Sequence, residues 1–299
     1  MPPLRSAPRP LLACLRLCLA AGLSAGLAAG CSTSPATGET HLNALTEPEE
    51  IQIGEQEAPA FLEAFGGEIP SSQIRQYVRD LGEQLATLSE RPHLPWEFFV
   101  VDSPILNAFA LPGGKVFVSR GLLAEMTNEA QLAAVLGHEI GHVTDEHLGR
   151  QMTRAAAAEM GLGLLGVAAG ADYETWVKVL GLGTNVYLLT FSRDQEHAAD
   201  ELGMRYMTQL GYHPDGAAQL MEILARASGS YPGFEFFATH PHPESRIDRI
   251  QAIIVDRYPD RDEPGRYSLH EPRFRETVLN ELPTLPPPSH DPEQQQQDG

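Results

Sequence analysis

The sequence has few cysteines and few basic residues. Two of its three cysteines, Cys14 and Cys18, lie within residues 1–30. Once that segment is removed only Cys31 remains, which excludes an internal disulfide. Lys and Arg total 21 against 40 Asp and Glu, so nucleic acid, which attracts basic side chains, is not expected as a partner. With 42% hydrophobic and 20% charged residues, the composition predicts a globular chain with a sizeable core.

Residues 1–30 have the composition of a secretory signal peptide. Three arginines precede an apolar run over 17–29, which is shorter than the roughly 20 residues needed to span a bilayer. The small residues before Cys31 resemble a bacterial lipobox. This resemblance implies cleavage before Cys31 and a lipid anchor on it, and Ser32 in the next position implies the outer membrane of a Gram-negative bacterium. The alternative is a secreted protein in which Cys31 is incidental.

Composition divides the rest of the chain into three parts. Residues 31–46 are rich in Ser, Thr, Gly and Pro, and we expect a flexible tether there. Residues 47–260 carry the periodic apolar patterns of a folded domain. Residues 261–299 form a C-terminal extension, which we expect to be disordered from about 281, where Pro, Gln and acidic residues dominate.

The patterns in the folded domain predict an α+β fold that is mainly helical. Apolar residues recur at helical spacing in several segments, namely 47–66 (interrupted near Pro59), 71–89, 128–143, 193–211, 215–227 and 243–257. Short strands are expected at 96–101, 107–111 and 115–119, the last two joined by a Pro-Gly-Gly turn. Segment 155–171 is apolar but carries Glu159, which favours a buried or lid helix over a membrane span.

The chemistry lies in the motif His138-Glu139-Ile140-Gly141-His142. Residues four apart share a helix face, so the two imidazoles can bind one ion. Glu139 is offset by one residue and can take a proton from water on that ion. Zinc suits two His and a carboxylate with one place left for water, and it lowers the pKa of that water towards about 7. The competing interpretation is two surface histidines on a helix.

A third ligand must come from another segment. Glu196 lies 54 residues after His142 on a predicted helix, and Asp200 shares its face. Alone, such a pair is usually a solvated helix face. Paired with the upstream motif, it predicts that Glu196 ligates the ion while Asp200 orients a ligand histidine through its other ring nitrogen.

Four motifs in order resemble one enzyme family. They are the strand and turn of 107–114, the histidine motif of 136–142, the acidic segment of 192–200, and Thr239-His240-Pro241 followed by Arg246. Over about residues 45–255 the chain is similar to the HtpX/BepA/LoiP-like gluzincin zinc metallopeptidases, in the CAAX prenyl endopeptidase superfamily. It most resembles the periplasmic lipoprotein branch, without the helical-repeat domain of some relatives.

The resemblance implies a zincin core with a small sheet beside the active-site helix and one zinc per subunit. It assigns His138, His142 and Glu196 as ligands, Glu139 as general base and Asp200 as the carboxylate behind a ligand. His240 either stabilises the oxyanion, with Arg246, or occupies the fourth zinc position in a latent state; a surface loop histidine is the alternative. Asn107 either begins an edge that binds extended substrate or belongs to a structural turn. For His93, His147, His197 and His213 the sequence indicates no partner.

These implications predict a periplasmic metalloendopeptidase, anchored by lipid to the outer membrane. Its expected substrates are unfolded or misassembled envelope proteins, and its expected partners include outer-membrane assembly machinery. The alternative is a zinc-bound chaperone or assembly factor with a latent protease site. A prenyl-peptide protease is disfavoured, because the spanning helices of that branch are lacking.

Overall fold

The computed structural model describes residues 31–160, 190–228, 236–241 and 243–289. The predicted signal peptide, and the part of segment 155–171 beyond residue 160, lie outside these described residues.

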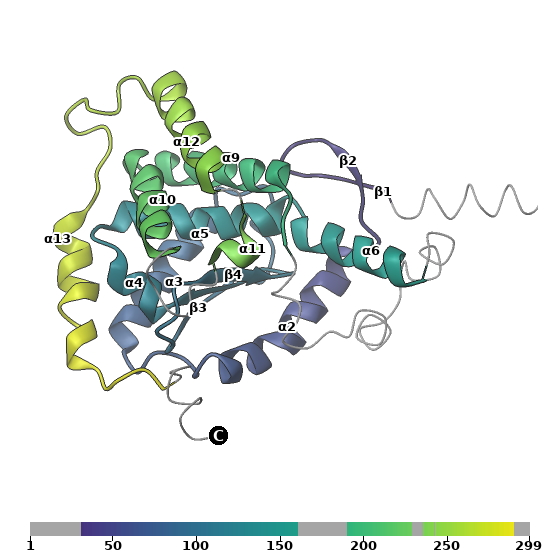
Figure 1. The fold of residues 1–299 in the computed structure, drawn as a ribbon, viewed down its shortest axis with the longest axis horizontal. Helices are drawn as coiled ribbons and strands as arrows, with labels where there is room; N and C mark the ends of the chain where they lie inside the picture. The colour runs from purple at the N-terminus through teal and green to yellow at the C-terminus, as the bar shows by residue number, and fades with distance from the viewer. Residues whose placement is uncertain (1–30, 161–189, 229–235, 242, 290–299) are drawn as a thin grey trace, which may run out of the picture.

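Helices make up most of the described chain and surround a small sheet, as the sequence predicts (Figure 1). The helices of four or more residues are α2 (Glu47–Ala64), α3 (Ser72–Ala86), α4 (Arg120–Glu125), α5 (Glu129–Thr144), α6 (His147–Met160), α9 (Arg193–Gln209), α10 (Asp215–Ser228), α11 (Phe236–Thr239), α12 (Pro243–Arg257) and α13 (Glu271–Phe274). The π-helix η3 (Arg275–Leu279) and the 3₁₀-helix η4 (Leu282–Thr284) follow. Helix α2 continues through Pro59, so the predicted interruption is wrong.

The predicted strands form one sheet in the order β3-β5-β4. Strand β3 (Glu97–Val101) runs parallel to β5 (Lys115–Ser119), and β5 pairs antiparallel with β4 (Ala108–Leu111). The turn between β4 and β5 needs glycine, because Gly113 has φ +74° and a Cβ there would lie 2.5 Å from Ile51 Cα. The hairpin predicted from the Pro-Gly-Gly sequence is therefore confirmed.

Helix α5 is the centre of the fold. It begins at Asn128, whose side chain accepts a hydrogen bond from the Gln131 amide. It contacts α3 and β4, and it packs against α9 and α10 (Figure 1). Every residue of α5 is buried. The polar side chains of the motif are therefore held in the interior, where each must find a partner.

Two apolar clusters build the core. The larger one gathers residues of α3, α5, α9 and α10 with one side of the sheet. The smaller one is aromatic and links α2 to the sheet, with the rings of Phe109 and Phe117 stacked 4.8 Å apart and that of Phe61 5.5 Å from Phe109. The two clusters fix the sheet and α2 around the central helix.

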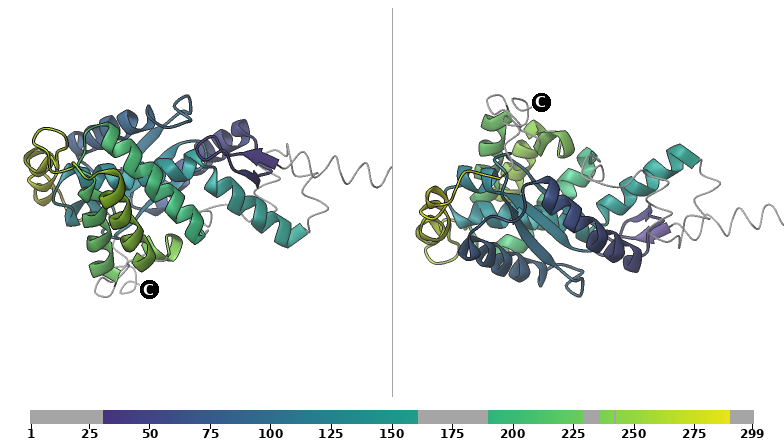
Figure 2. Two further views of the ribbon diagram at one scale, coloured as in Figure 1. Left: turned by 90° about the horizontal axis from the view of Figure 1, so that it is seen from above. Right: turned by 90° about the horizontal axis from the view of Figure 1, so that it is seen from below.

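The segment 31–46 is ordered, so the predicted flexible tether is wrong for this structure. Strands β1 (Cys31–Thr33) and β2 (Thr40–Leu42) pair antiparallel and form a hairpin that lies beside α6 (Figure 2). The hydroxyls of Ser34 and Thr37 in this segment donate hydrogen bonds to Asp145. Composition indicates a solvated linker because it cannot reveal partners so far away in sequence.

The C-terminal extension is folded further than predicted. Arg120 donates to the carbonyl oxygens of Leu282 and Pro286, and both the amide and the hydroxyl of Ser289 donate to Asp102. Disorder beginning at about 281 is therefore contradicted for the described residues up to 289. Hydrogen bonds from Arg120 and to Asp102 hold this Pro-rich segment against the folded domain.

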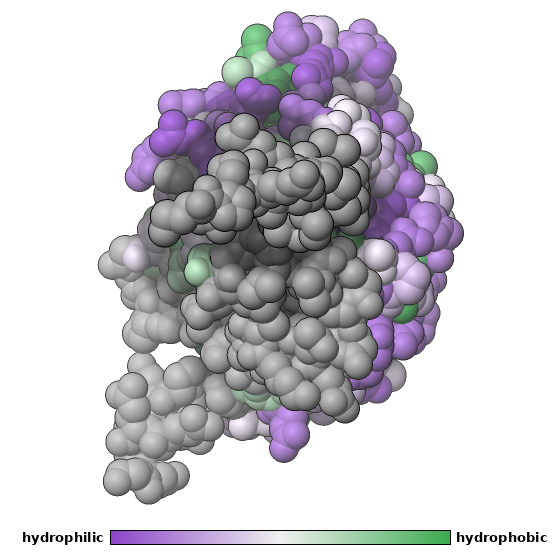
Figure 3. Space-filling view, turned by 90° about the vertical axis from the view of Figure 1, so that its right-hand side faces the viewer, coloured by the Kyte–Doolittle hydropathy of each residue, from purple (hydrophilic) through white to green (hydrophobic). Residues whose placement is uncertain are grey.

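The described surface is largely polar. Among the residues that are coloured in Figure 3, hydrophilic ones predominate over small apolar areas. Across the described ranges, Val255 is the large apolar side chain that stays exposed, at 68%. No helix in this part of the chain has both the length and the apolar composition that crossing a bilayer needs.

Candidate metal centre

Close backbone packing brings helices α5 and α9 together. A Cβ placed on Gly203 would lie 2.7 Å from the backbone nitrogen of His138, and one on Gly141 would lie 3.1 Å from Ala199 Cα. Only glycine permits this approach without displacing backbone. Consequently the histidine motif on α5 faces the acidic segment on α9.

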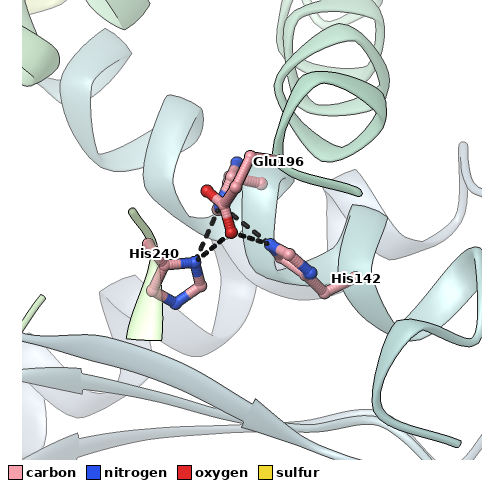
Figure 4. Close-up of side chains that lie close together, drawn as sticks. His142, Glu196 and His240 are labelled. Carbon is pink, nitrogen blue, oxygen red and sulfur yellow. Dashed lines mark hydrogen bonds and ion pairs between the residues drawn. The ribbon is translucent and has the colours of Figure 1, made fainter. Parts of the chain in front are cut away.

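His142 and Glu196 point toward one another (Figure 4), and His138 lies beside both. The Nε2 atoms of His138 and His142 are 3.0 Å apart. Oxygen Oε2 of Glu196 is 3.6 Å from Nε2 of His138, and its Oε1 is 3.5 Å from Nε2 of His142. The structure therefore brings together the three residues that the sequence nominates as ligands.

His240 joins the same group. It follows α11, and its Nδ1 atom lies 3.1 Å from Oε1 of Glu196 and 3.3 Å from Nε2 of His138 (Figure 4). The side chain is 1% exposed, so it is not a surface loop histidine. The sequence leaves two buried roles open for His240, oxyanion stabilisation and a fourth zinc ligand. Its position matches that of a fourth donor to the ion.

The donor set fits a divalent metal. One ligand atom from each of His138, His142, Glu196 and His240 lies within 4.8 Å of the others, and all four residues are buried. Burial lowers the pKa of His142 and of His240 well below the usual value, so both rings are neutral and keep a free lone pair. Three imidazole nitrogens and one carboxylate oxygen are donors that zinc accepts.

Asp200 and Arg246 support the donors from behind. Nδ1 of His138 lies 2.9 Å from Oδ1 of Asp200, which directs the other ring nitrogen into the cluster. Arg246 donates to both carboxylate oxygens of Asp200, at 2.7 and 2.9 Å. Burial alone would raise the pKa of Asp200, but the charge of Arg246 and the hydrogen bond to His138 lower it below its usual value. Asp200 is therefore ionised.

Arg246 is engaged by carboxylates on both sides. Its Nη1 atom is 2.7 Å from Oε2 of Glu196, an ion pair that lacks hydrogen-bond geometry. Its other nitrogens hold Asp200, and the side chain is 2% exposed. Resemblance implies that Arg246 holds the oxyanion. In the structure Arg246 fixes two carboxylates at the cluster, and the oxyanion role stays a prediction.

Glu139 and Asn107 are buried polar groups with unused atoms. Oε1 of Glu139 makes no hydrogen bond within the described part of the chain, and Nε2 of His240 lies 3.7 Å from it. Burial first, and then the charge of Glu196, raise the pKa of Glu139 well above its usual value. Asn107 precedes β4, and both polar atoms of its side chain lack a hydrogen-bond partner among the described residues. Each is therefore available to an incoming group.

The sequence misses the environment of His142. Nδ1 of His147 lies 2.9 Å from Nδ1 of His142, although the sequence indicates no partner for His147. The contact depends on the two-residue corner at Asp145 and Glu146, where Glu146 has φ +55°, and no periodic pattern predicts such a conformation. Cys31, the expected lipid site, begins β1.

Comparison with known proteins finds similarity to metallopeptidases. The sequence profile of peptidase family M48 matches residues 72–254. The beta-barrel assembly-enhancing protease of Escherichia coli K12 is 31% identical over 228 residues, covering 72% of this chain and 46% of that protein. The mitochondrial metalloendopeptidase OMA1 of Schizosaccharomyces pombe is 33% identical over 183 residues, covering 60% and 53%. The chain thus spans about half the length of these relatives.

Proposed function

The chain belongs to peptidase family M48, and from this membership and the buried donor cluster we propose that it is a zinc metalloendopeptidase of the bacterial cell envelope. The observation that carries the proposal is the convergence of His138, His142 and Glu196 around one point, with Glu139 beside them. A zinc ion held there would polarise a peptide carbonyl and make water a nucleophile at neutral pH.

The protein's own residues handle the protons. Glu139 takes a proton from the attacking water and passes it to the leaving amine. Asp200 keeps a proton on Nδ1 of His138, so that Nε2 remains free for the ion. The unpartnered amide of Asn107, at the start of β4, is available to the main chain of an extended substrate.

The substrates are unfolded or misassembled envelope proteins. An extended chain offers its main chain to a strand edge regardless of sequence, which suits an enzyme that removes varied misfolded proteins. The lipobox-like sequence before Cys31 supports a lipid anchor on the outer membrane, facing the periplasm. One relative is named for β-barrel assembly, which supports a partnership with outer-membrane assembly machinery.

The substitution Glu139→Gln tests the chemistry, because it keeps the shape of the side chain and removes its basicity. We expect unchanged zinc content and thermal stability, and a loss of casein cleavage of roughly 10²- to 10⁴-fold. Glu83→Gln, at an exposed position of α3, serves as the matched control and cleaves like wild type. A Glu139→Gln enzyme that digests casein at the wild-type rate refutes the mechanism, as does wild-type cleavage that survives a chelator.

The position of His240 favours a second candidate function. With His240 as a fourth donor the site is closed, and the protein would act as a zinc-bound chaperone or assembly factor with a latent protease. In a strain that lacks the protein, Glu139→Gln would then repair the envelope defect as well as wild type does. Failure of this variant to repair the defect assigns the function to proteolysis.

A further inference from the structure

The side chains of His147 and then Asp145 lead away from the metal ligand His142 in a chain of hydrogen bonds. Because Nε2 of His142 faces the cluster, its other nitrogen, Nδ1, carries the proton and donates to Nδ1 of His147 over 2.9 Å. Nε2 of His147 then donates to Oδ2 of Asp145 over 2.7 Å. His147 is 0% exposed and Asp145 2% exposed, so neither can exchange these partners for water.

The far end of this chain is held by the N-terminal hairpin. Oδ1 of Asp145 accepts hydrogen bonds from the hydroxyls of Ser34 and of Thr37. Oε2 of the neighbouring Glu146 accepts from Ser32 and Asn43, at 2.9 and 3.0 Å. The hairpin thus binds both acidic residues of the corner that joins α5 to α6. The ribbon of the hairpin lies next to this corner (Figures 1 and 2).

The corner has the geometry needed to return His147 onto His142. Helix α5 ends at Thr144 and α6 begins at His147, so two residues make the corner. Glu146 adopts φ +55°, a conformation uncommon for a residue with a side chain. As a result the rings of His142 and His147 meet edge to face, with centroids 4.9 Å apart.

We propose that His147 and Asp145 position the metal ligand His142, and that the N-terminal hairpin holds this pair through Ser34. The proposal rests on the metal site of the proposed function. A ligand histidine needs its second nitrogen fixed, because this hydrogen bond sets the tautomer, the ring direction and the basicity of the ligand. Asp200 does this for His138. For His142 the described residues offer His147 in that place, with the Asp145 carboxylate behind it.

The test is zinc affinity, measured on purified, metal-stripped protein by competition with a chromophoric chelator. His147→Leu removes the acceptor for His142, and we expect zinc binding about 10- to 100-fold weaker. His147→Gln restores an acceptor oxygen and recovers part of that loss. His213→Leu, which removes a histidine that contacts acidic residues outside the cluster, leaves the affinity unchanged. The visible spectrum of the cobalt-loaded protein changes in His147→Leu and not in His213→Leu.

Ser34→Ala tests the long-range part of the proposal. Ser34 does not contact His142 directly, so a merely local role predicts no effect on zinc. We expect binding weaker by roughly two- to fivefold, because Asp145 loses a buried donor. Ser89→Ala is the matched control, since Ser89 is also buried but bonds locally, donating to the Ala86 carbonyl and accepting from the Arg91 amide.

The outcomes separate this proposal from the proposed function. If wild type binds no zinc, the metal site itself fails. If wild type binds zinc and the folded His147→Leu and Ser34→Ala variants bind it equally well with an unchanged cobalt spectrum, the positioning role is overturned. Should His147→Leu fail to fold, Asp145→Asn, which keeps the side-chain shape and removes the charge, carries the same expectation of weaker zinc binding. Wild-type affinity in that variant overturns the proposal.

Discussion

Nδ1 of His240 lies 3.1 Å from Oε1 of Glu196, inside the group of atoms that would bind the metal. Both side chains are buried, with 1% and 0% exposed. A catalytic zinc site keeps one position open for water and substrate, whereas a structural site has four protein ligands. With His240 as a fourth ligand, a bound zinc would have no position open for a peptide carbonyl.

His240→Ala is expected to increase peptidase activity. If the open arrangement is a minor state of at most about 10%, removing the fourth donor raises casein cleavage by roughly tenfold or more. The measurement is the initial cleavage rate at equal zinc occupancy. In the double variant with Glu139→Gln the gained activity disappears if it comes from this site. Activity at or below the wild-type level would instead assign His240 to oxyanion stabilisation.

Arg246→Ala is expected to destabilise the metal-free protein by roughly 3–5 kcal/mol, because it leaves the buried carboxylates of Asp200 and Glu196 without their cation. Urea unfolding of the stripped protein measures this loss. With zinc bound the loss is smaller, since the ion compensates Glu196. Arg249→Ala, on the same helix but exposed and paired with Glu201, changes the free energy of unfolding by less than about 1 kcal/mol. Equal effects of the two variants contradict this assignment.

The parts of the site that the sequence predicts are those that follow from one helix. His138 and His142 share a face because they are four residues apart, and Asn128 caps the helix as predicted. The pairing of α5 with α9 depends on backbone contact at Gly203, which no spacing reveals. Resemblance to a family, rather than periodicity, supplied His240.

The parts that the sequence misses depend on contacts between distant segments. Ser34 and Asp145 are 111 residues apart, and their hydrogen bond orders a segment whose composition indicates a linker. His147 meets His142 across the corner at Glu146. Arg246 meets its partners for a related reason, because the carboxylates of Glu196 and Asp200 come from another helix, α9.

Glu50 is expected to make stability depend on pH. It is 3% exposed and 2.7 Å from Arg91, and burial raises the pKa of its carboxyl to about 7 despite that cation. Between pH 4.5 and 7 the folded protein therefore holds a proton that the unfolded chain has released, so this contribution to stability is lost as the pH rises through the window.

Glu50→Gln removes this dependence. Between pH 4.5 and 7.5, we expect the free energy of unfolding of the variant to increase by about 3 kcal/mol relative to that of wild type. The variant thus gains stability relative to wild type as the pH rises. Urea unfolding at several pH values measures it, with Glu55→Gln at an exposed position of the same helix as the control. A difference that stays constant with pH contradicts the expectation.

Gly203→Ala is expected to separate the two helices that carry the donors. The added methyl would lie 2.7 Å from the backbone nitrogen of His138 and 2.9 Å from the carbonyl carbon of Gly137, so α9 must move away from α5. We expect a loss of about 1–3 kcal/mol in unfolding free energy and weaker zinc binding, because Glu196 moves with α9. Gly82→Ala is the informative comparison. Its methyl would meet the Phe98 ring at 2.4 Å, but α3 carries no donor. It should therefore lower stability without changing the zinc affinity of the folded protein. If both variants lower zinc affinity equally, zinc binding follows global stability rather than the spacing of α5 and α9.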